Sequence, residues 1–166
     1  PFAATPGCTV GSVAPSTRPG VGVDIYGTYE HTIDVKGRLV LPSPYRSAFA
    51  DGGIAALIED YAALFTTEEW DRYRLRLEES GQFTRDELLS IVSFVSPFTP
   101  DAQNRISLPQ RLRDKTGLGR DVTLVGSIRY FSVFSSAEWA RREAAVEAKA
   151  ETGPSIADKF RSLEFL

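Results

Sequence analysis

The chain carries one short sequence pattern twice, and this duplication constrains its fold more than any other feature. Segment 34–46 aligns with segment 101–113, and each contains an Asp-x-x-x-Arg motif, then Leu-Pro, then a second Arg. Four later positions recur in the same order, with Tyr61, Phe65, Glu69 and Trp70 matching Tyr130, Phe134, Glu138 and Trp139. Such a repeat indicates one supersecondary unit per copy, and repeated units bury their apolar faces against each other.

Each copy is predicted to open with a β-hairpin. Residues 26–33 are rich in aromatic and β-branched side chains, and residues 39–41 form a second short apolar run, as is typical of strands. Gly37 lies in the turn between them and permits the positive φ that a tight connection requires. Asn104 takes this place in the second copy, and Asn also tolerates the left-handed region. We therefore expect a left-handed backbone at both turns.

The pattern after each hairpin predicts helices and further strands. Short helices at about 43–49 and 109–116 follow the two prolines, and Ser43-Pro44 fits an N-cap followed by proline at the first helical position. Two more strands per copy are expected at 54–58, 62–65, 122–125 and 130–134. Capping boxes, which begin at Thr66 and Ser135, then predict a longer helix in each copy.

A third capping box begins at Thr84 and predicts a helix that bridges the two copies. Its apolar residues are expected to face inward: Leu88, Ile91, Val92 and Val95. A last amphipathic helix is predicted from Ile156 to about Leu166, after a break in the chain at 151–154. These elements divide the chain into a leader 1–24, a first module 25–80, a bridging helix 81–96, a second module 97–150 and a C-terminal helix 151–166.

The leader 1–24 is rich in Pro, Gly, Ser, Thr and Ala, and this composition predicts disorder. The chain also contains no methionine. We therefore hypothesise that the natural start is a GTG codon read as Val21 or Val23. The intact mass of the native protein tests this hypothesis, because a species that contains Phe2 to Pro19 would contradict it.

The residue types that most enzymes and metal sites require are scarce in this chain. Cys8 is the only cysteine and His31 the only histidine, so neither an internal disulfide nor a Cys/His zinc cage can form. The sequence also lacks the glycine-rich phosphate-binding motifs of nucleotide-dependent enzymes. We expect no enzyme activity, metal, cofactor or small-molecule substrate, and structural roles for His31, Trp70 and Trp139. No apolar run is long enough for a membrane span, so we expect a cytoplasmic protein.

The charge of the chain bears on nucleic-acid binding. The formal net charge of −3 argues mildly against it, because phosphate contacts normally leave a basic footprint. The charge is unevenly distributed, however. Segment 68–87 holds seven acidic residues, whereas segment 101–120 holds five basic residues and two acidic ones. The net negative charge therefore weakens a DNA-binding hypothesis but does not exclude it.

The turn residues are expected to have two different roles, one in shaping the turn and one in contacting DNA. Asp34 and Asp101 are interpreted as turn-structuring residues, with Gly37 and Asn104, because an Asp at a turn start commonly bonds to its own backbone. A carboxylate can also orient a guanidinium and leave other donors for phosphate or a guanine edge. The predicted DNA contacts are Lys36, Arg38, Gln103 and Arg105, followed by Arg46 and Arg113; Arg111, Lys115 and Arg120 are weaker candidates.

At these residues the chain resembles the MraZ family of bacterial transcriptional regulators. The matching stretches are GTYEHTIDVKGRLVLP with the following YR, DAQNRISLP with the following LR, GLGRDVTLVG and SIADKFRSL. The resemblance runs from about residue 25 to 166. It implies an α+β fold of two AbrB-like swapped-hairpin β-barrel modules with flanking helices and pseudo-twofold symmetry. Asn104 departs from the Gly that is more usual in the family.

The resemblance also implies a function. It implies a repressor of its own promoter and of the division and cell-wall gene cluster, which binds short direct repeats in double-stranded DNA. It implies a ring-shaped homo-oligomer in the cytoplasm, associated with the nucleoid. Lys36 and Arg38 correspond to the DNA-contacting turn of the family, and Arg105 corresponds to it in the second module.

Two non-enzymatic alternatives stay open on the sequence alone. The first is an oligomeric protein-interaction scaffold in which the Asp/Arg turns only stabilise the fold. The salt dependence of nucleic-acid binding separates it from a regulator, because phosphate contacts give a steep slope. The second is a dimeric AbrB-like antitoxin, which would need a separate toxin-binding tail.

Overall fold

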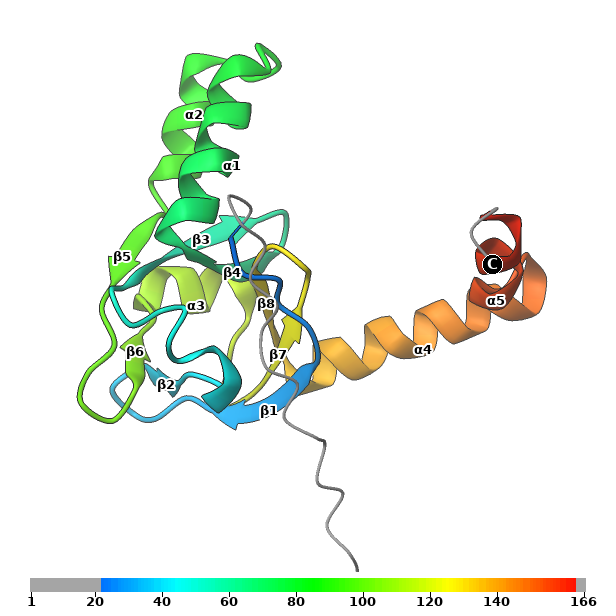
Figure 1. Ribbon diagram of the computed structural model, residues 1–166, viewed down its shortest axis with the longest axis horizontal. Helices are drawn as coiled ribbons and strands as arrows, with labels where there is room; N and C mark the ends of the chain where they lie inside the picture. The colour runs from blue at the N-terminus through cyan, green and yellow to red at the C-terminus, as the bar shows by residue number, and fades with distance from the viewer. Residues whose placement is uncertain (1–21, 164–166) are drawn as a thin grey trace, which may run out of the picture.

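Strands from the two repeats lie side by side in the larger of two sheets. The computed structural model describes residues 22–163, and within them one sheet has the strand order β1-β7-β8-β4-β3-β5 (Figure 1). Its strands are β1 (Thr28–Thr32), β3 (Gly53–Ile58), β4 (Tyr61–Thr66), β5 (Ser96–Phe98), β7 (Asp121–Gly126) and β8 (Phe131–Ser135). A second sheet pairs β2 (Arg38–Val40) with β6 (Arg105–Ser107). Every pairing in these sheets is antiparallel.

The two repeats exchange their first strands. β1 of the first repeat pairs with β7 of the second, with Tyr29 opposite Leu124. β5, which occupies the corresponding place in the second repeat, pairs with β3 of the first, with Gly53 opposite Phe98. The central contact, β4 with β8, also joins the two repeats. The α+β fold with swapped hairpins that the resemblance implied is therefore confirmed, and the repeats form one interleaved unit rather than two separate domains.

The main core lies between the two sheets and is built from equivalent residues of both repeats. Leu39 and Ile106 lie opposite each other in the β2–β6 pair and are both almost completely buried. Leu41 and Leu108, which precede the two repeated prolines, are buried as well. Aromatic side chains fill the remaining space, where Phe131 packs against Tyr45 and Phe49. The duplication thus supplies a core that neither copy could enclose alone.

The helices lie at the outside of the sheets. α1 (Thr67–Glu79) and α2 (Arg85–Val92) form a hairpin at the top of Figure 1, and α3 (Gln110–Thr116) packs against β3 and β4. α4 (Ser136–Thr152) extends away from the sheets and is followed by α5 (Ile156–Ser162). Among residues 22–163, none of these helices combines the length and apolar character that crossing a membrane requires.

The three predicted capping boxes form to different extents. At α2, Thr84 accepts from the Glu87 backbone and the Glu87 side chain accepts from the Thr84 backbone, so this box is complete. At α1 and α4, Thr66 and Ser135 also accept from the backbone three residues on. The glutamates of these two helices instead bind arginines, as described below.

Three expectations about local structure are wrong. The predicted helix at 43–49 is a single 3-10 turn, Ser43–Tyr45, whose N-cap is Pro42 and not Ser43. The inward orientation predicted for the bridging helix is wrong for Val92, which is 48% exposed, whereas Leu88 and Ile91 are half-buried and Val95 packs against the apolar cluster around Phe65 and Trp70. Residues 22–24 also differ from the predicted disordered leader. Asp24 is buried and accepts a hydrogen bond from the Tyr26 hydroxyl at 3.1 Å.

The two ends of the chain also bear on the predictions. The last helix is shorter than predicted, because α5 ends at Ser162 and Leu163 is extended. The predicted disorder of residues 1–21 lies outside the described residues. Of the two hypothetical start positions, Val21 also lies outside, whereas Val23 packs against the main core.

Candidate nucleic-acid interface

The first Asp-x-x-x-Arg turn is organised by one carboxylate. Oδ1 of Asp34 accepts hydrogen bonds from the backbone N–H groups of Lys36 and Arg38, both at 2.9 Å. Oδ2 accepts from Nε of Arg38 at 2.7 Å. The side chain therefore closes the turn and orients the guanidinium at the same time.

The second turn repeats this arrangement almost atom for atom. Oδ1 of Asp101 accepts from the backbone of Gln103 at 2.8 Å and of Arg105 at 3.0 Å. Oδ2 accepts from Nε of Arg105 at 2.7 Å. Arg38 and Arg105 have equally exposed side chains, at 28% each. Their terminal amino groups bond to none of the described residues, so both guanidiniums keep donors for an external acceptor.

The backbone at both turns is left-handed, as the sequence indicates. Gly37 has a φ of 76° and Asn104 a φ of 57°. Their carbonyl groups also join the repeats, because Gly37 O accepts from Leu108 N–H and Asn104 O accepts from Leu41 N–H, each at 2.9 Å. The two turns thus lie at opposite ends of the short β2–β6 ladder and are held in a fixed relation.

The ionisation of the two aspartates favours this geometry. The backbone hydrogen bond from Arg38 lowers the pKa of Asp34 below its ordinary value of 3.8, despite some opposing desolvation. The backbone hydrogen bond from Arg105 lowers the pKa of Asp101 in the same way. Both carboxylates are therefore ionised at neutral pH and stay paired with their arginines.

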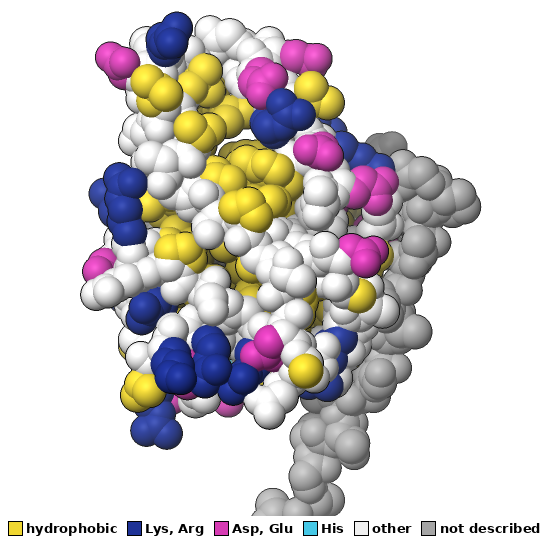
Figure 2. All heavy atoms as spheres, turned by 90° about the vertical axis from the view of Figure 1, so that its left-hand side faces the viewer, with side chains coloured by type: hydrophobic (Ala, Val, Ile, Leu, Met, Phe, Trp, Pro, Cys, Tyr) yellow, Lys and Arg dark blue, Asp and Glu magenta, His cyan; other side chains and the backbone are white. Residues whose placement is uncertain are grey.

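Arg113 of the second repeat lies over the turn of the first repeat. Its Nε donates to the carbonyl of Leu108 at 3.0 Å. Its Nη2 lies 2.8 Å from the point that a Cβ on Gly37 would occupy, so a larger residue at position 37 would displace this guanidinium. Arg46 makes the equivalent bond to Leu41 O at 3.3 Å. Figure 2 shows Lys and Arg side chains gathered at the lower end of the face that carries β6.

The other predicted contacts have mixed surroundings. Lys36 is exposed beside Val35, whose side chain is fully exposed at the tip of the first turn. Arg120 is exposed and lines a shallow pocket together with Asp34 and Arg113. Arg111 instead stacks over Phe94 at 4.2 Å and donates to the carbonyl of Ser93 at 3.2 Å, which gives it a structural role.

The residues expected to be structural are placed as follows. Trp70 is buried beside Phe65 in a smaller apolar cluster, apart from the main core, that also holds Ala56, Ile58 and Ala63. Trp139 is only half-buried and stacks on Phe134. His31 is half-buried, and its pKa is lowered first by desolvation and then by the positive charge of Arg46.

Sequence reasoning missed the composite nature of the first turn. Arg113 was predicted only as a DNA contact, whereas its guanidinium lies against Gly37 of the other repeat. A signal was present in the sequence, because glycine occupies position 37 where the second repeat tolerates Asn104. It became interpretable only when the strand pairing brought α3 to this turn.

Comparison with known proteins identifies the family. A family model of MraZ proteins, described as antitoxin-like, matches residues 25–89 and again residues 96–160. The chain belongs to the MraZ family. The two MraZ matches coincide with the two interleaved repeats, and each contains one Asp-x-x-x-Arg turn.

Curated MraZ relatives resemble the chain over most of its length. The transcriptional regulator MraZ of Acetivibrio thermocellus is 30% identical over 143 residues, which cover 83% of this chain and 97% of the relative. The transcriptional regulator MraZ of Desulfosudis oleivorans is 33% identical over 68% of this chain and 81% of the relative. That of Roseiflexus castenholzii is 30% identical over 84% of this chain and 98% of the relative.

Proposed function

We propose that this chain is a DNA-binding transcriptional regulator that reads short direct repeats in promoter DNA through its two Asp-x-x-x-Arg turns. The single observation that carries the proposal is the pair of oriented, partly exposed guanidiniums of Arg38 and Arg105. Each is fixed by its own aspartate at 2.7 Å and has terminal donors left over. Arginine in a fixed orientation is the side chain best suited to phosphate or to a guanine edge.

The two turns are proposed to contribute unequally. The first presents Lys36 and Arg38, and Arg113 lies against it. The second presents Arg105 with the neutral Gln103, and we assign Gln103 a hydrogen-bonding contact without charge. Arg46 is proposed as a further contact on the same side of the β2–β6 pair. The first turn is therefore the stronger phosphate-binding element, and the second is the weaker reader.

A ring-shaped homo-oligomer is part of the proposal. A single chain with a net charge of −3 offers few phosphate contacts, so its affinity at physiological salt would be low. Linked sites on successive direct repeats gain about 10²–10⁴ in avidity. Large apolar side chains exposed on α2, α4 and α5 and directly after α5 support assembly, since such residues commonly mark interaction surfaces: Leu89, Val92, Val146, Ile156, Phe160 and Leu163.

The proposed target follows from family membership. We infer that the regulator acts on the promoter of its own gene and on the division and cell-wall cluster behind it, as a repressor associated with the nucleoid. The relatives named transcriptional regulators support regulation. Footprinting of the DNA upstream of the gene tests the choice of target.

The decisive experiment compares Arg38→Ala with Arg85→Ala. Arg85 lies at the start of α2 and serves as a matched loss of one positive charge outside the turns. Arg38→Ala is expected to abolish gel-shift binding to the promoter repeats while light scattering shows an unchanged oligomer. Arg85→Ala is expected to bind as the wild type does. An Arg38→Ala variant with wild-type affinity would refute the assignment.

The oligomeric scaffold is the second candidate. The exposed apolar residues of α2 and α5 favour it as well, because they support assembly without DNA. Measuring affinity at several salt concentrations separates the two candidates. A regulator that contacts phosphates loses affinity steeply as salt rises, whereas a scaffold shows no specific DNA complex at any salt concentration.

A further inference from the structure

An apolar side chain lies at the tip of each Asp-x-x-x-Arg turn. The N–H of Gly37 donates to the carbonyl of Asp34 at 2.9 Å, so Val35 and the residue after it form the centre of a β-turn. The side chain of Val35 is fully exposed. Ala102 holds the equivalent place in the second turn and is exposed as well. Both tips therefore present an apolar group to the outside.

The local structure gives no reason for valine at this position. The central residues of turns are usually Gly, Pro, Asn, Asp or Ser, whereas β-branched residues favour strands. The carboxylate of Asp34 closes the turn through Lys36 and Arg38, without any contribution from the side chain of Val35. Single exposed apolar residues are common on protein surfaces, and what distinguishes Val35 is its position among the proposed DNA contacts.

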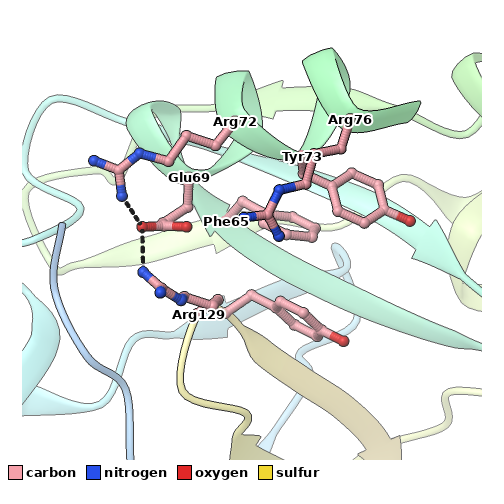
Figure 3. A pocket seen from close by; sticks show the side chains of 7 residues that line it. Phe65, Glu69, Arg72, Tyr73, Arg76 and Arg129 are labelled. Atoms are coloured by element: carbon pink, nitrogen blue, oxygen red, sulfur yellow. Dashed lines mark hydrogen bonds and ion pairs between the residues drawn. The ribbon is translucent and has the colours of Figure 1, made fainter. Parts of the chain in front are cut away.

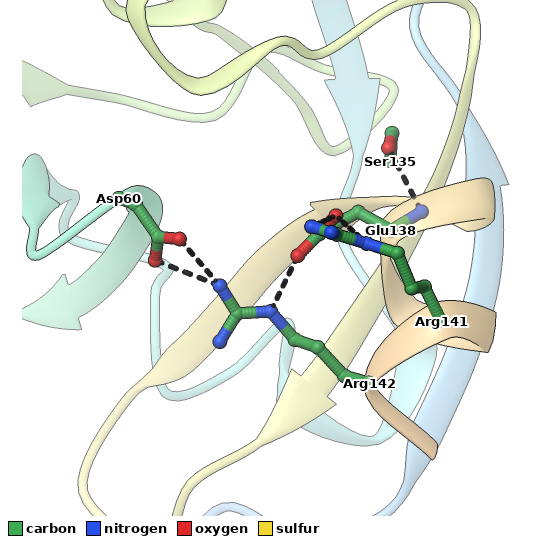
Figure 4. Close-up of polar contacts among 5 residues, drawn as sticks. All are labelled: Asp60, Ser135, Glu138, Arg141 and Arg142. Atoms are coloured by element: carbon green, nitrogen blue, oxygen red, sulfur yellow. Dashed lines mark hydrogen bonds and ion pairs between the residues drawn. The ribbon is translucent and has the colours of Figure 1, made fainter. Parts of the chain in front are cut away.

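Arginines elsewhere in the described residues are held by carboxylates of the same chain. Arg72 of α1 donates to Glu69, as Figure 3 shows, and to the glutamate before it, each at 2.7 Å. Arg142 of α4 donates to Glu138 at 2.9 Å and to both carboxylate oxygens of Asp60, at 2.8 and 2.6 Å (Figure 4). These ion pairs tie α1 and α4 to their surroundings and leave little charge for an external anion.

The cations around Val35 are different. Lys36 follows it directly and is exposed. Val35 also lines a shallow pocket of about 550 Å³, together with Arg113 and Arg120. None of these three cations forms an ion pair with another residue of 22–163. Phosphate contacts position a protein on the duplex, so cations at these places would bring the apolar tip to the base edges.

The major groove of DNA presents one methyl group on its base edges, at C5 of thymine. The other three bases offer hydrogen-bonding atoms there and no methyl group, and the minor groove has none at all. The major groove also admits a two-stranded β-ribbon. The first turn is the tip of such a ribbon, because the N–H of Asp34 donates to the carbonyl of Arg38 at 2.9 Å. An apolar tip of this shape matches thymine better than any other base.

We propose that Val35 packs against the C5-methyl group of a thymine in the major groove and is the specificity-determining residue of the first turn. The inference rests on the proposed DNA binding of that turn and adds the base that the turn reads. Ala102 carries a shorter apolar side chain, so the second turn distinguishes thymine less well. The two turns therefore differ in the sequence they read as well as in charge.

The test compares two duplexes that carry the promoter repeats, one with thymine and one with uracil at every thymine position. Uracil lacks only the C5-methyl group. In fluorescence anisotropy, the wild type is expected to bind the thymine duplex at least about fourfold more tightly, the value of burying one methyl group. Val35→Ser is expected to bind both duplexes equally, with an affinity close to that of the wild type for the uracil duplex.

Two further variants separate the contacts. Ala102→Ser makes the matched change in the second turn and is expected to keep most of the preference for thymine. Lys36→Ala is expected to weaken binding to both duplexes alike and to lower the salt slope by about one, as for the loss of a phosphate contact. Val35→Ser should keep the wild-type salt slope, because it removes no charge. Serine is also favoured in turns, so this variant is expected to fold.

Each other outcome has a distinct meaning. Equal binding of the two duplexes by the wild type would overturn the role of Val35 and leave the proposed DNA binding intact. A thymine preference that persists in Val35→Ser, or that Ala102→Ser loses to the same extent, would overturn it as well. Absence of binding to either duplex would refute the proposed DNA binding and the inference with it.

Discussion

At the scale of single residues, each turn aspartate accepts three hydrogen bonds within four positions of the chain. The two oxygens of Asp34 receive the backbone of Lys36 and both the backbone and the side chain of Arg38. Because these bonds join residues of the same turn, they form whenever the turn forms, and they fix the orientation of the Arg38 guanidinium. The affinity of the protein for DNA should therefore depend on the aspartate as well as on the arginine.

Replacing Asp34 with Asn tests this dependence. The amide oxygen can still accept from the backbone, but the amide nitrogen cannot accept from Nε of Arg38. We expect about tenfold weaker binding to promoter repeats in fluorescence anisotropy, because the guanidinium loses its fixed orientation. Asp101→Asn is the matched variant and is expected to have a smaller effect. An equal or larger effect at Asp101 would contradict the proposed dominance of the first turn.

The acid stability of the turns is predicted from the same bonds. The folded-state pKa values of Asp34 and Asp101 lie below 3.8. A lowered carboxyl pKa stabilises the folded state above the unfolded pKa, and this contribution is lost as the pH falls through the folded pKa. We expect both carboxyl groups to titrate below 3.8 when followed by carbon NMR. Titration of either group at or above the ordinary value would show that the turn bonds are absent in solution.

Gly37 is expected to tolerate substitution less well than Asn104. An alanine at position 37 would carry a positive φ of 76° and would place its Cβ 2.8 Å from Nη2 of Arg113. The left-handed backbone alone costs about 1–2 kcal/mol for a residue with a Cβ. Gly37→Ala should therefore lower the free energy of unfolding in urea by at least that amount. Asn104→Gly should change it by less than about 1 kcal/mol, and the opposite ranking would rule out this explanation.

At the scale of elements, α4 and α5 contribute little to the core of the single chain. Neither helix contains a buried residue, although Arg142 ties the start of α4 to Asp60. Ile156 and Phe160 of α5 are more than half exposed. Exposed apolar residues of this kind commonly mark contacts with another protein molecule, and we expect α5 to contact a second copy of this chain.

Removal of residues 153–166 separates a role of α5 in assembly from a role in the core of the single chain. We expect the circular dichroism spectrum of the truncated protein to lose only the helical signal of α5, because none of the described residues 153–163 is buried. We also expect light scattering to show a smaller assembly and gel shifts to show weaker binding to multiple repeats. Phe160→Ser serves as a milder variant with the same expected direction. A truncated protein of unchanged size would exclude α5 from the assembly.

At the scale of the whole molecule, the repeats depend on each other for folding. The pairs β1–β7, β4–β8, β3–β5 and β2–β6 all join one repeat to the other. A polypeptide of residues 22–95 alone would leave these strand edges and the shared core uncovered. Exposed edges and apolar faces of this kind favour pairing with another chain.

Splitting the chain between β5 and α2 tests this interdependence. Fragment 22–95 is expected to be unfolded or self-associated by itself, and to fold when mixed with fragment 96–163. Proton NMR dispersion and sedimentation of each fragment and of the mixture report the result. A well-dispersed spectrum from monomeric 22–95 would contradict the interleaved core.

Features that depend on near neighbours were predictable from the sequence. The left-handed turns, the complete capping box at Thr84 and the strand positions follow from residues at most a few places apart. The predictions that are wrong concern segments whose conformation or burial depends on residues distant in the sequence. The expected helix at 43–49 shortens to one 3-10 turn, after which Phe49 is buried in the shared core. The apolar stripe of α2 has the right spacing, but none of its residues is fully buried in the single chain.

The sequence by itself determined the duplication and the chemistry of the two turns, because an aspartate, a positive-φ residue and an arginine act within five consecutive positions. The tertiary structure alone decided that the repeats interleave and that Arg113 lies over Gly37 of the other copy. It also decided that Arg142 of the second repeat pairs with Asp60 of the first. The physical reason is distance along the chain: these properties arise from contacts between residues tens of positions apart, which local propensity does not encode.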